Sequence, residues 1–227
     1  MYESNIEMER SGEQCYTIAR FPRVTGAINC TLIKIDSPGG EDAEIFRSRK
    51  GFFALNVQTV SDTNLKIRDI VVRWPGATRD QTIFNNSNLK HEFESGTFGR
   101  FLPVGDSGYT LQPYLMTKLQ EARTVAENLY NESIIITRNV VERQYGVWKR
   151  RFPTLRFGMR LNLDRVMAIL VATAVLHNIA VDMKDSRPNL AADFVVEDHE
   201  EEPDNVINVH NARHYRQLII NAYLSRL

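Results

Sequence analysis

The sequence predicts a mixed α/β domain from two observations. Apolar and β-branched residues are concentrated in three short runs between residues 26 and 73, a pattern typical of strands. Two later stretches, residues 121–151 and 161–183, instead have the apolar spacing of helices. The 227 residues are 43% hydrophobic and 25% charged, as in an ordinary soluble globular protein. Strands followed by helices therefore indicate a sheet that is covered by helices.

The first half of the chain supplies most of the predicted sheet. Residues 1–20 are polar and only weakly patterned. Three antiparallel strands are predicted after them, and the residues between the second and the third, Asp62 to Asn64, are typical of a hairpin turn. The strands span residues 26–36, 52–60 and 65–73.

The second half is predicted to be mainly helical. Pro75 and Gly76 force a loop, after which Thr78 or Asp80 could cap a helix that runs to about Phe93. A short strand that ends in a turn (100–109) and a long helix (121–151) follow, and a break of this helix at Asn131 is one alternative. A second long helix (161–183) is apolar on most sides and is therefore expected to be buried. A short amphipathic helix is predicted at the end of the chain. This order fits an RNase H-like mixed sheet flanked by helices, although several other α+β folds share it.

The cysteine content and the apolar runs predict a soluble intracellular protein. Cys15 and Cys30 form no CxxC pair, so a disulfide framework or a structural zinc site is not expected. The N-terminus is polar and acidic, unlike a signal or transit peptide. The longest apolar run, 166–176, is short of the ~20 residues that span a bilayer. We therefore expect no membrane partner.

Two acidic residues stand out by their surroundings. Asp106 lies in GDSGY at the end of a predicted strand, and Glu142 lies among valines on the long helix. The 35 residues between them (107–141) match the spacing of the last two acids of transposases and integrases. Such carboxylates can bind two divalent cations, which activate water and stabilise the leaving oxygen when a phosphodiester is hydrolysed. The alternative is structural: Glu142 would pair with Arg138, four residues earlier, and Asp106 would cap a turn.

Several longer blocks resemble one family. They are FPRVTGAINCTLIKI, RSRKGFFALNVQ, VVRWPGATRDQTIF, VGDSGYTLQPYLMT, YNESIIITRNVVERQYGVWKRRFP and VATAVLHNIA. In order and spacing they are similar to the DDE-superfamily endonuclease domain of PIF/Harbinger transposases, and especially to the Harbinger transposase-derived nucleases of animals. The match runs from about Cys15 to Ala180. This resemblance implies an RNase H-like fold and cleavage of DNA that depends on a divalent metal cation, Mg²⁺ or Mn²⁺.

The resemblance also implies where the catalytic and metal-binding acids lie. Asp106 matches the acid of the GDSGY block, Glu142 the glutamate of the long helix, and Asp80 the acid after the WPG turn. The fourth position is the aspartate of the first strand, which the family has within Gly-Ala-Ile-Asp-Cys-Thr-His. Here that strand reads GAINCTLI, so Asn29 replaces the carboxylate and Leu32 replaces the histidine.

Asn29 predicts that cleavage is impaired. An amide offers one neutral carbonyl oxygen and cannot bridge two cations as a carboxylate can. The loss of one unit charge beside a dication is worth on the order of several kcal/mol, or roughly a thousandfold in rate. Leu32 and Arg79 also replace histidines of the family at this site. These further changes favour a natural origin of Asn29 over an engineered mutation or a sequence error.

Two oppositely charged segments explain the formal net charge of zero. Residues 138–165 contain eight basic residues and two acids, whereas residues 185–205 contain eight acids and one arginine. A basic helix end beside acidic residues suits a phosphate backbone. The alternatives are a solvated helix face and, for the acidic segment, a solvating loop or a DNA mimic. The residues predicted to contact nucleic acid are Arg138, Lys149, Arg150 and Arg151.

These observations lead to four segments and to competing functions. The segments are a short N-terminal remnant (1–20), the DDE endonuclease domain (21–184), an acidic surface loop (185–207) and a C-terminal helix (208–227). The first function is a divalent-metal-dependent DNA endonuclease whose cleavage is impaired by Asn29. The alternatives are a non-catalytic DNA or protein interaction module that keeps the nuclease fold, and a decaying transposon fragment. DNA is the expected partner; the resemblance adds a Myb/trihelix-like DNA-binding protein and a location in the nucleus and also the cytoplasm.

Overall fold

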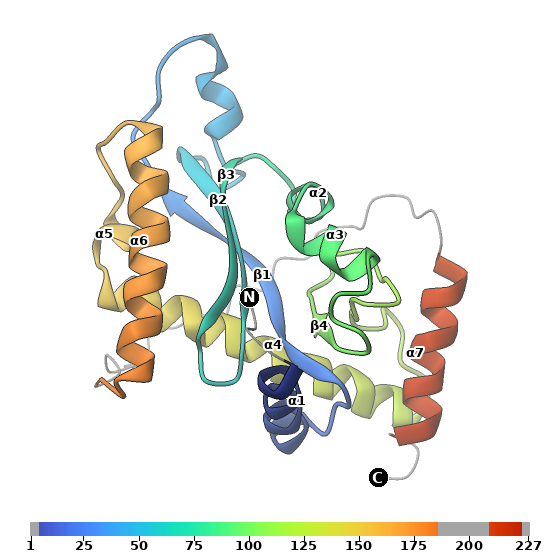
Figure 1. Cartoon of the computed structure of the whole chain (residues 1–227). Helices are drawn as coiled ribbons and strands as arrows, with labels where there is room; N and C mark the ends of the chain where they lie inside the picture. Colours follow the sequence, from blue (N-terminus) through green and yellow to red (C-terminus); the bar gives the residue numbers. More distant parts are fainter. Residues whose placement is uncertain (1–4, 186–208, 224–227) are drawn as a thin grey trace.

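The computed structural model describes residues 5–185 and 209–223, which form a four-stranded sheet flanked by helices (Figure 1). The strands are β1 (Val24–Lys34), β2 (Ala54–Ser61), β3 (Ile67–Pro75) and β4 (Leu102–Val104). The helices are α1 (Asn5–Ala19), the 3₁₀ helix η1 (Glu41–Phe46), α2 (Asp80–Asn85), α3 (Asn88–Glu94), α4 (Val125–Arg151), α5 (Thr154–Phe157), α6 (Leu163–Asp182) and α7 (Val209–Tyr223).

The sheet is mixed and has the order β3-β2-β1-β4. β1 pairs with β2 and β2 pairs with β3 antiparallel, whereas β1 pairs with β4 parallel. The hairpin between β2 and β3 forms at the predicted turn, where Asp62 Oδ1 accepts hydrogen bonds from the backbone N–H groups of Asn64 and Lys66 at 2.9 and 3.0 Å. The predicted fold class, a mixed sheet flanked by helices, is confirmed, and it is consistent with the RNase H-like plan.

Helices cover both faces of the sheet. α4 packs on β1 and β2, α6 packs on β3 and against α4, and α2 packs on β2. Successive side chains of a strand point to opposite faces. The larger core therefore gathers alternate residues of β1, such as Ala27 and Ile33, with Trp148 of α4. A smaller core on the other face gathers Ile28 with Tyr109.

The helix predicted between residues 78 and 93 is in fact two short helices, α2 and α3. Ser87 lies between them and acts as the N-cap of α3, because its Oγ accepts from the Lys90 N–H at 3.2 Å. The same hydroxyl donates to the carbonyl of Phe84 at 2.7 Å. Both bonds stabilise a turn where a continuous helix was expected.

The predicted helix 121–151 begins later than expected and has no break. Thr124 and Glu127 form a capping box, so α4 starts at Val125. The side chain of Asn131 bonds to both backbone groups of Leu119, at 2.7 and 3.0 Å, and leaves the hydrogen bonds of its own helix intact. Asn131 therefore ties the preceding loop to α4 instead of interrupting it.

The ends of the chain differ from the expectation of a weakly patterned N-terminus. Residues 5–19 form α1, which packs on β1 and α4 with Met8, Cys15 and Ala19 buried. The C-terminal helix is described as α7, which contacts α4. The predicted acidic loop lies outside the described residues, except for Asp185.

The prediction that residues 161–183 are buried on most sides is wrong. Val166, Leu170 and His177 face inward, and His177 Nε2 lies 2.7 Å from the carbonyl oxygen of Leu65. The opposite side of α6 is exposed and apolar, with Val175 at 54% and Ile179 at 48% exposure. By length and composition alone α6 could also cross a membrane, a test that core helices of soluble proteins pass as well.

Candidate nuclease site

Two of the predicted site residues lie on neighbouring segments of the sheet: Asn29 lies within β1, and Asp106 follows the end of β4 by two residues. The pairing of β1 with β4 aligns Ala27 with Val104. Continuing this register by two residues brings Asn29 level with Asp106. The carboxylate of Asp106 caps the following turn, because its Oδ1 accepts from the Gly108 N–H at 2.9 Å. Asp106 is 3% exposed, so the loop after β4 holds its carboxylate against the sheet.

Glu142 reaches Asn29 from α4, the helix that covers this face. Asn29 Nδ2 donates to Glu142 Oε1 at 2.6 Å, and Asn29 Oδ1 accepts from the backbone N–H of Cys30 at 2.8 Å. The amide could not be turned the other way, because its NH₂ group would then face the Cys30 N–H, a second donor. Tyr145, one turn after Glu142, donates to the carbonyl oxygen of Asn29 at 2.5 Å. Asn29 therefore presents a hydrogen-bond donor, and no oxygen, to Glu142.

Basic groups offset the burial of Glu142. Burial is the largest influence and raises the pKa of the Glu142 carboxyl above its ordinary value, and the charge of Asp106 raises it further. The charges of Arg138 and Lys149 and the hydrogen bond from Asn29 act in the opposite direction. Arg138 lies 3.8 Å from Glu142 Oε1, the i, i+4 pair that the sequence offered as the structural alternative. Glu142 is thus surrounded by the protein's own positive and donor groups.

Asp80 lies on the other face of the sheet. Its Oδ1 accepts from Asn56 Nδ2 at 2.9 Å. Asn56 is paired with Leu32, and directly paired residues share a face, so Asn56 points away from the face of Asn29. Burial raises the pKa of the Cys30 thiol, and the nearby charges of Asp80 and Asp106 both raise it further. Asp80 is 5% exposed at the start of α2.

The side chains present do not complete a site for a divalent cation. Within residues 5–185 and 209–223, no group of three or more His, Cys, Asp and Glu side chains could hold a metal ion. In the part of the chain that the structure describes, Asp106 and Glu142 supply the carboxylates near position 29, and Asn29 turns its N–H group towards Glu142. A hard cation such as Mg²⁺ requires oxygen ligands. Asp106 and Glu142 therefore supply two carboxylates, and Asn29 supplies an amide whose oxygen is already bonded to the Cys30 N–H.

The basic residues predicted to contact nucleic acid are largely occupied within the fold. Arg138 is 6% exposed and pairs with Glu142. Lys149 Nζ donates to Thr31 Oγ1 at 2.7 Å, and Arg151 pairs with Asp185 at 2.5 Å. Arg150 is half-buried on the last turn of α4. The last turns of α4 therefore contact the sheet and the loop after α6 more than they form an open basic face.

Lys149 gives a prediction about pH dependence. Burial lowers the pKa of its ammonium group to about 8 from the ordinary value of 10.5. Between those two pH values the unfolded chain binds more protons than the folded one, so stability rises with pH. We expect the free energy of unfolding to rise by up to about 1.4 kcal/mol per pH unit in this window relative to Lys149→Met. Urea unfolding of both proteins at pH 7.5, 8.5 and 9.5 checks this, and parallel pH profiles would contradict it.

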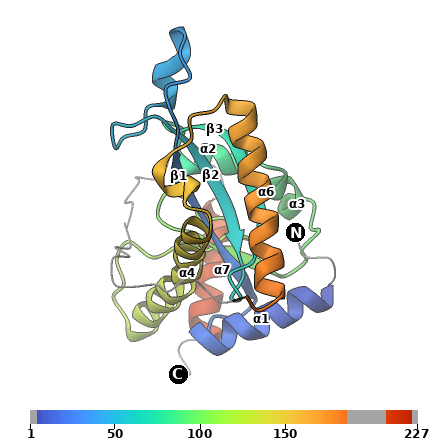
Figure 2. The ribbon, with the colours of Figure 1, turned by 90° about the vertical axis from the view of Figure 1, so that its left-hand side faces the viewer.

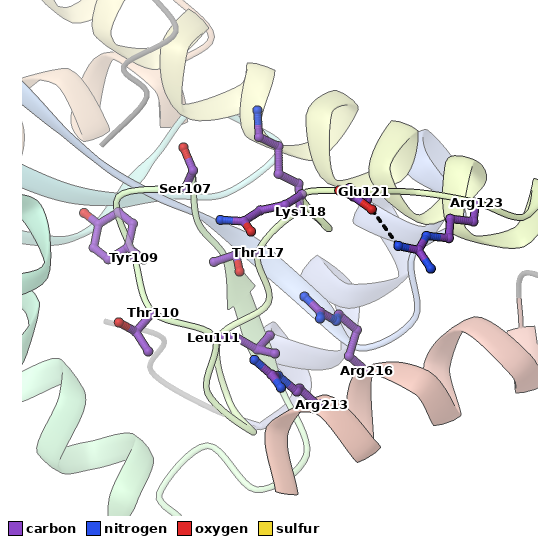
Figure 3. Close-up of a pocket in the computed structure, with 11 residues that line it drawn as sticks. Ser107, Tyr109, Thr110, Leu111, Thr117, Lys118, Glu121, Arg123, Arg213 and Arg216 are labelled. Carbon is purple, nitrogen blue, oxygen red and sulfur yellow. Dashed lines mark hydrogen bonds and ion pairs between the residues drawn. The ribbon is translucent and has the colours of Figure 1, made fainter. Parts of the chain in front are cut away.

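A basic pocket adjoins the loop that carries Asp106 (Figure 3). It has a volume of about 590 Å³ and is lined by loop residues on one side and by two arginines of α7 on the other. Arg213 and Arg216 extend from α7 towards the loop that carries Leu111 and Thr117. Burial is the main cause of a lowered pKa of Arg216, and the charge of Arg213 lowers it further. Two guanidinium groups that repel each other favour an anion between or beside them.

The loop side of this pocket adds two cations and one acid. Lys118 lines it, and Arg123 pairs with Glu121 at 2.7 Å. The pocket therefore has an excess of positive charge. Sequence reasoning missed it because its basic groups come from distant segments. The only local signal was the spacing of Arg213 and Arg216, which places both on one face of a helix.

The arrangement defines a class of protein. Site positions within one strand, just after the parallel strand beside it and on the helix that covers them are consistent with the layout of an α/β nuclease domain. The chain belongs to the DDE superfamily endonuclease family, which matches residues 28–178. The sequence-based assignment to this family and its similarity to Harbinger transposase-derived proteins are confirmed.

The matched region covers only part of each relative. The chain is 30% identical over 173 residues to "Putative nuclease HARBI1" of Bos taurus and of Homo sapiens, which is 75% of this chain and 49% of each relative. It is 27% identical over 184 residues to "Protein ALP1-like" of Arabidopsis thaliana, which is 74% of this chain and 45% of that protein. The chain thus spans about half the length of the curated relatives it matches. No solved structure matches it significantly.

Proposed function

We propose that the chain is a DNA-binding member of the nuclease family whose metal-dependent cleavage is impaired by Asn29. One observation carries the proposal: the amide of Asn29 donates to Glu142 at 2.6 Å, where the family has a carboxylate. Asp106 follows the neighbouring strand β4, at the level of Asn29 if the register of β1 with β4 continues. The three positions that would share a cation are therefore near one another, since the charge of Asp106 also acts on Glu142, and one of them lacks charge. An aspartate at position 29 would supply the missing group.

A non-catalytic DNA or protein interaction module is the second candidate function. It is favoured by the charges around Glu142, because Arg138 and Lys149 already stabilise the charged form of its carboxylate, as a bound cation otherwise would. In that case the fold and the basic surfaces would be functional and the acids would be structural. The two candidates differ in one outcome, which is whether any cleavage by the wild-type protein depends on Glu142.

Nicking of supercoiled plasmid in Mn²⁺ tests the proposal. We expect wild type to nick slowly or not at all, and Asn29→Asp to nick roughly a thousandfold faster than wild type because a charged ligand is restored. The double variant Asn29→Asp/Glu142→Gln is the control and should lose the gain. If Asn29→Asp stays at the wild-type rate, the proposal fails. If wild type nicks rapidly and Glu142→Gln abolishes this, cleavage is intact and the impairment is disproved.

The basic pocket supports DNA as the partner and gives a separate prediction. Arg213→Gln combined with Lys118→Gln should weaken binding of double-stranded DNA in EDTA. The slope of log affinity against log salt should fall by about 0.9 for each phosphate that the protein no longer neutralises. Arg10→Gln, a change of the same kind at an exposed position of α1, is the control and should leave the slope unchanged. Fluorescence anisotropy at several salt concentrations measures this, and equal slopes for all proteins would contradict it.

We also propose the partner and location that the family resemblance implies. A separate Myb/trihelix-like protein would supply sequence recognition, and the complex would be nuclear, with some of the chain in the cytoplasm. Co-precipitation of this chain with such a protein, together with imaging of a tagged chain with and without it, tests both points. An unchanged location without the partner would contradict the proposal.

A further inference from the structure

The outer side of α6 is an apolar surface without charges. Between Arg165 and Asp182 the helix contains no charged residue. The inward side packs on β3 and α4. The outward side consists of the exposed residues Ala168, Val171, Ala172, Val175, Leu176 and Ile179. In Figure 2, α6 lies beside α5 on the side that faces the viewer. Val171, Val175, Leu176 and Ile179 are each between 42% and 54% exposed. A contiguous surface of this kind indicates an interaction site.

The spacing on this surface is that of a helix–helix seam. Residues 165, 168, 172, 175, 179 and 182 of α6 follow alternating steps of three and four, which keeps them on one side of the helix. The middle of the seam carries alanine at 168 and 172 and larger side chains at 175 and 179. Small residues allow two helix axes to approach closely, and larger ones fill the gaps.

The seam is complementary to itself when a second copy runs antiparallel to it. A two-fold axis between residues 173 and 174 places Ala168 opposite Ile179 and Ala172 opposite Val175, so a small residue meets a larger one at both levels. Val171 and Leu176 form the flanking pair. The same axis places Arg165 opposite Asp182 at each end. Size and charge thus match in one register, as a two-fold symmetric interface requires.

We propose that α6 mediates a symmetric homodimer through this antiparallel pairing. The end charges decide the orientation, because a parallel pair would place Arg165 against Arg165 and Asp182 against Asp182. Asp182 is 60% exposed while its Oδ1 contacts Lys66 Nζ at 2.5 Å, so its second oxygen can accept from an arginine of another copy. The proposal does not depend on the nuclease proposal, because α6 lies over β3 while the candidate site lies at β1 and β4.

Analytical ultracentrifugation of the full chain over a range of concentrations tests this proposal. Wild type is expected to be dimeric. Val175→Glu should raise the dimer dissociation constant on the order of a hundredfold or more, because each dimer would bury two unpaired charges. Ile135→Glu is the matched control, since Ile135 is 48% exposed on α4 and lies outside the seam. A monomeric wild type, or equal effects of both variants, would overturn the proposal. A monomeric wild type that sediments with phosphatidylcholine vesicles would instead identify a lipid surface as the occupant.

A charge exchange tests the register itself. Arg165→Glu places two acids together at each end of the dimer, and Asp182→Arg places two arginines together, so either change alone should weaken dimerisation. The double variant Arg165→Glu/Asp182→Arg restores the opposite charges with their positions exchanged. Its dissociation constant should return to within a few fold of the wild-type value. The antiparallel register would be disproved if the double variant dimerised as weakly as the effects of the two single substitutions combined predict.

Discussion

Asn29→Asp should lower the melting temperature of the metal-free protein and make that temperature rise when Mn²⁺ is added. The substitution removes the 2.6 Å hydrogen bond to Glu142 and places a second carboxylate beside it. Loss of the bond and repulsion between the two acids together cost about 2–4 kcal/mol. For a chain of this size each kcal/mol shifts the melting temperature by about 2–4 °C. A fall of roughly 5–15 °C is therefore expected without metal.

Mn²⁺ should reverse this loss in the variant only. Binding at a hundred times the dissociation constant would add about 2.7 kcal/mol to the stability of Asn29→Asp. Wild type should change little, because its amide offers Glu142 a donor where a cation would need an oxygen ligand. Asn29→Leu is the control: it also loses the hydrogen bond but adds no carboxylate, so Mn²⁺ should not stabilise it. Thermal unfolding followed by circular dichroism measures all three, and equal responses of the three proteins would contradict the prediction.

Gly26→Ala should destabilise the protein by on the order of 3 kcal/mol or more, the largest effect expected of a single methyl group here. A Cβ at position 26 would lie 2.4 Å from the backbone carbonyl oxygen of Ser61, on the strand to which β1 is paired. That oxygen belongs to the ladder and cannot rotate away as a side chain would. β1 must therefore shift, and the shift would reach Asn29, three residues further along the strand.

Gly12→Ala is the matched control for this prediction. Gly12 lies within α1, and a Cβ there would meet the ring of Phe101 at 3.4 Å, close to an ordinary contact. Alanine is a better helix former than glycine by about 0.5–1 kcal/mol, so this variant should be neutral or slightly more stable. Urea unfolding of both variants measures the difference. Similar losses at both positions would show that the pairing of β1 with β2 is not as tight as the structure indicates.

Much of the fold could be predicted from local patterns. The runs at 26–36, 52–60 and 65–73 became β1, β2 and β3 within two residues, because alternation and turn residues act over a few positions. The turn at Asp106 and the i, i+4 contact of Glu142 with Arg138 also depend on neighbours in sequence. Position 29 was identified only because the family resemblance fixed which strand residue faces the helix.

The parts that could not be predicted depend on contacts between distant segments. Asp80 follows a loop, and the path of that loop decides which face of the sheet Asp80 contacts. No local sequence pattern reveals that Asp80 accepts a hydrogen bond from Asn56. Lys149 looked free for DNA, yet the sheet brings Thr31 to within hydrogen-bond distance of it. An all-round apolar helix usually indicates burial. α6 departs from this because the described elements cover only one of its sides.

The groups that compensate the buried charge of Glu142 are central to the proposed function. A buried carboxylate needs compensation, and a metal ion, a basic side chain or a hydrogen-bond donor can provide it. In this chain the compensation comes from Arg138, Lys149 and the amide of Asn29. We therefore infer that Asn29 both withholds a charged ligand and supplies, through its hydrogen bond to Glu142, part of the compensation that a cation would provide. We therefore expect a folded protein with little metal affinity.

Calorimetric titration of Mn²⁺ into wild type and into Asn29→Asp tests this claim most directly. The account predicts no measurable binding heat for wild type and saturable binding for Asn29→Asp, which Glu142→Gln in the same background should abolish. Saturable Mn²⁺ binding by wild type with the affinity of Asn29→Asp, or no binding by either protein, would contradict it.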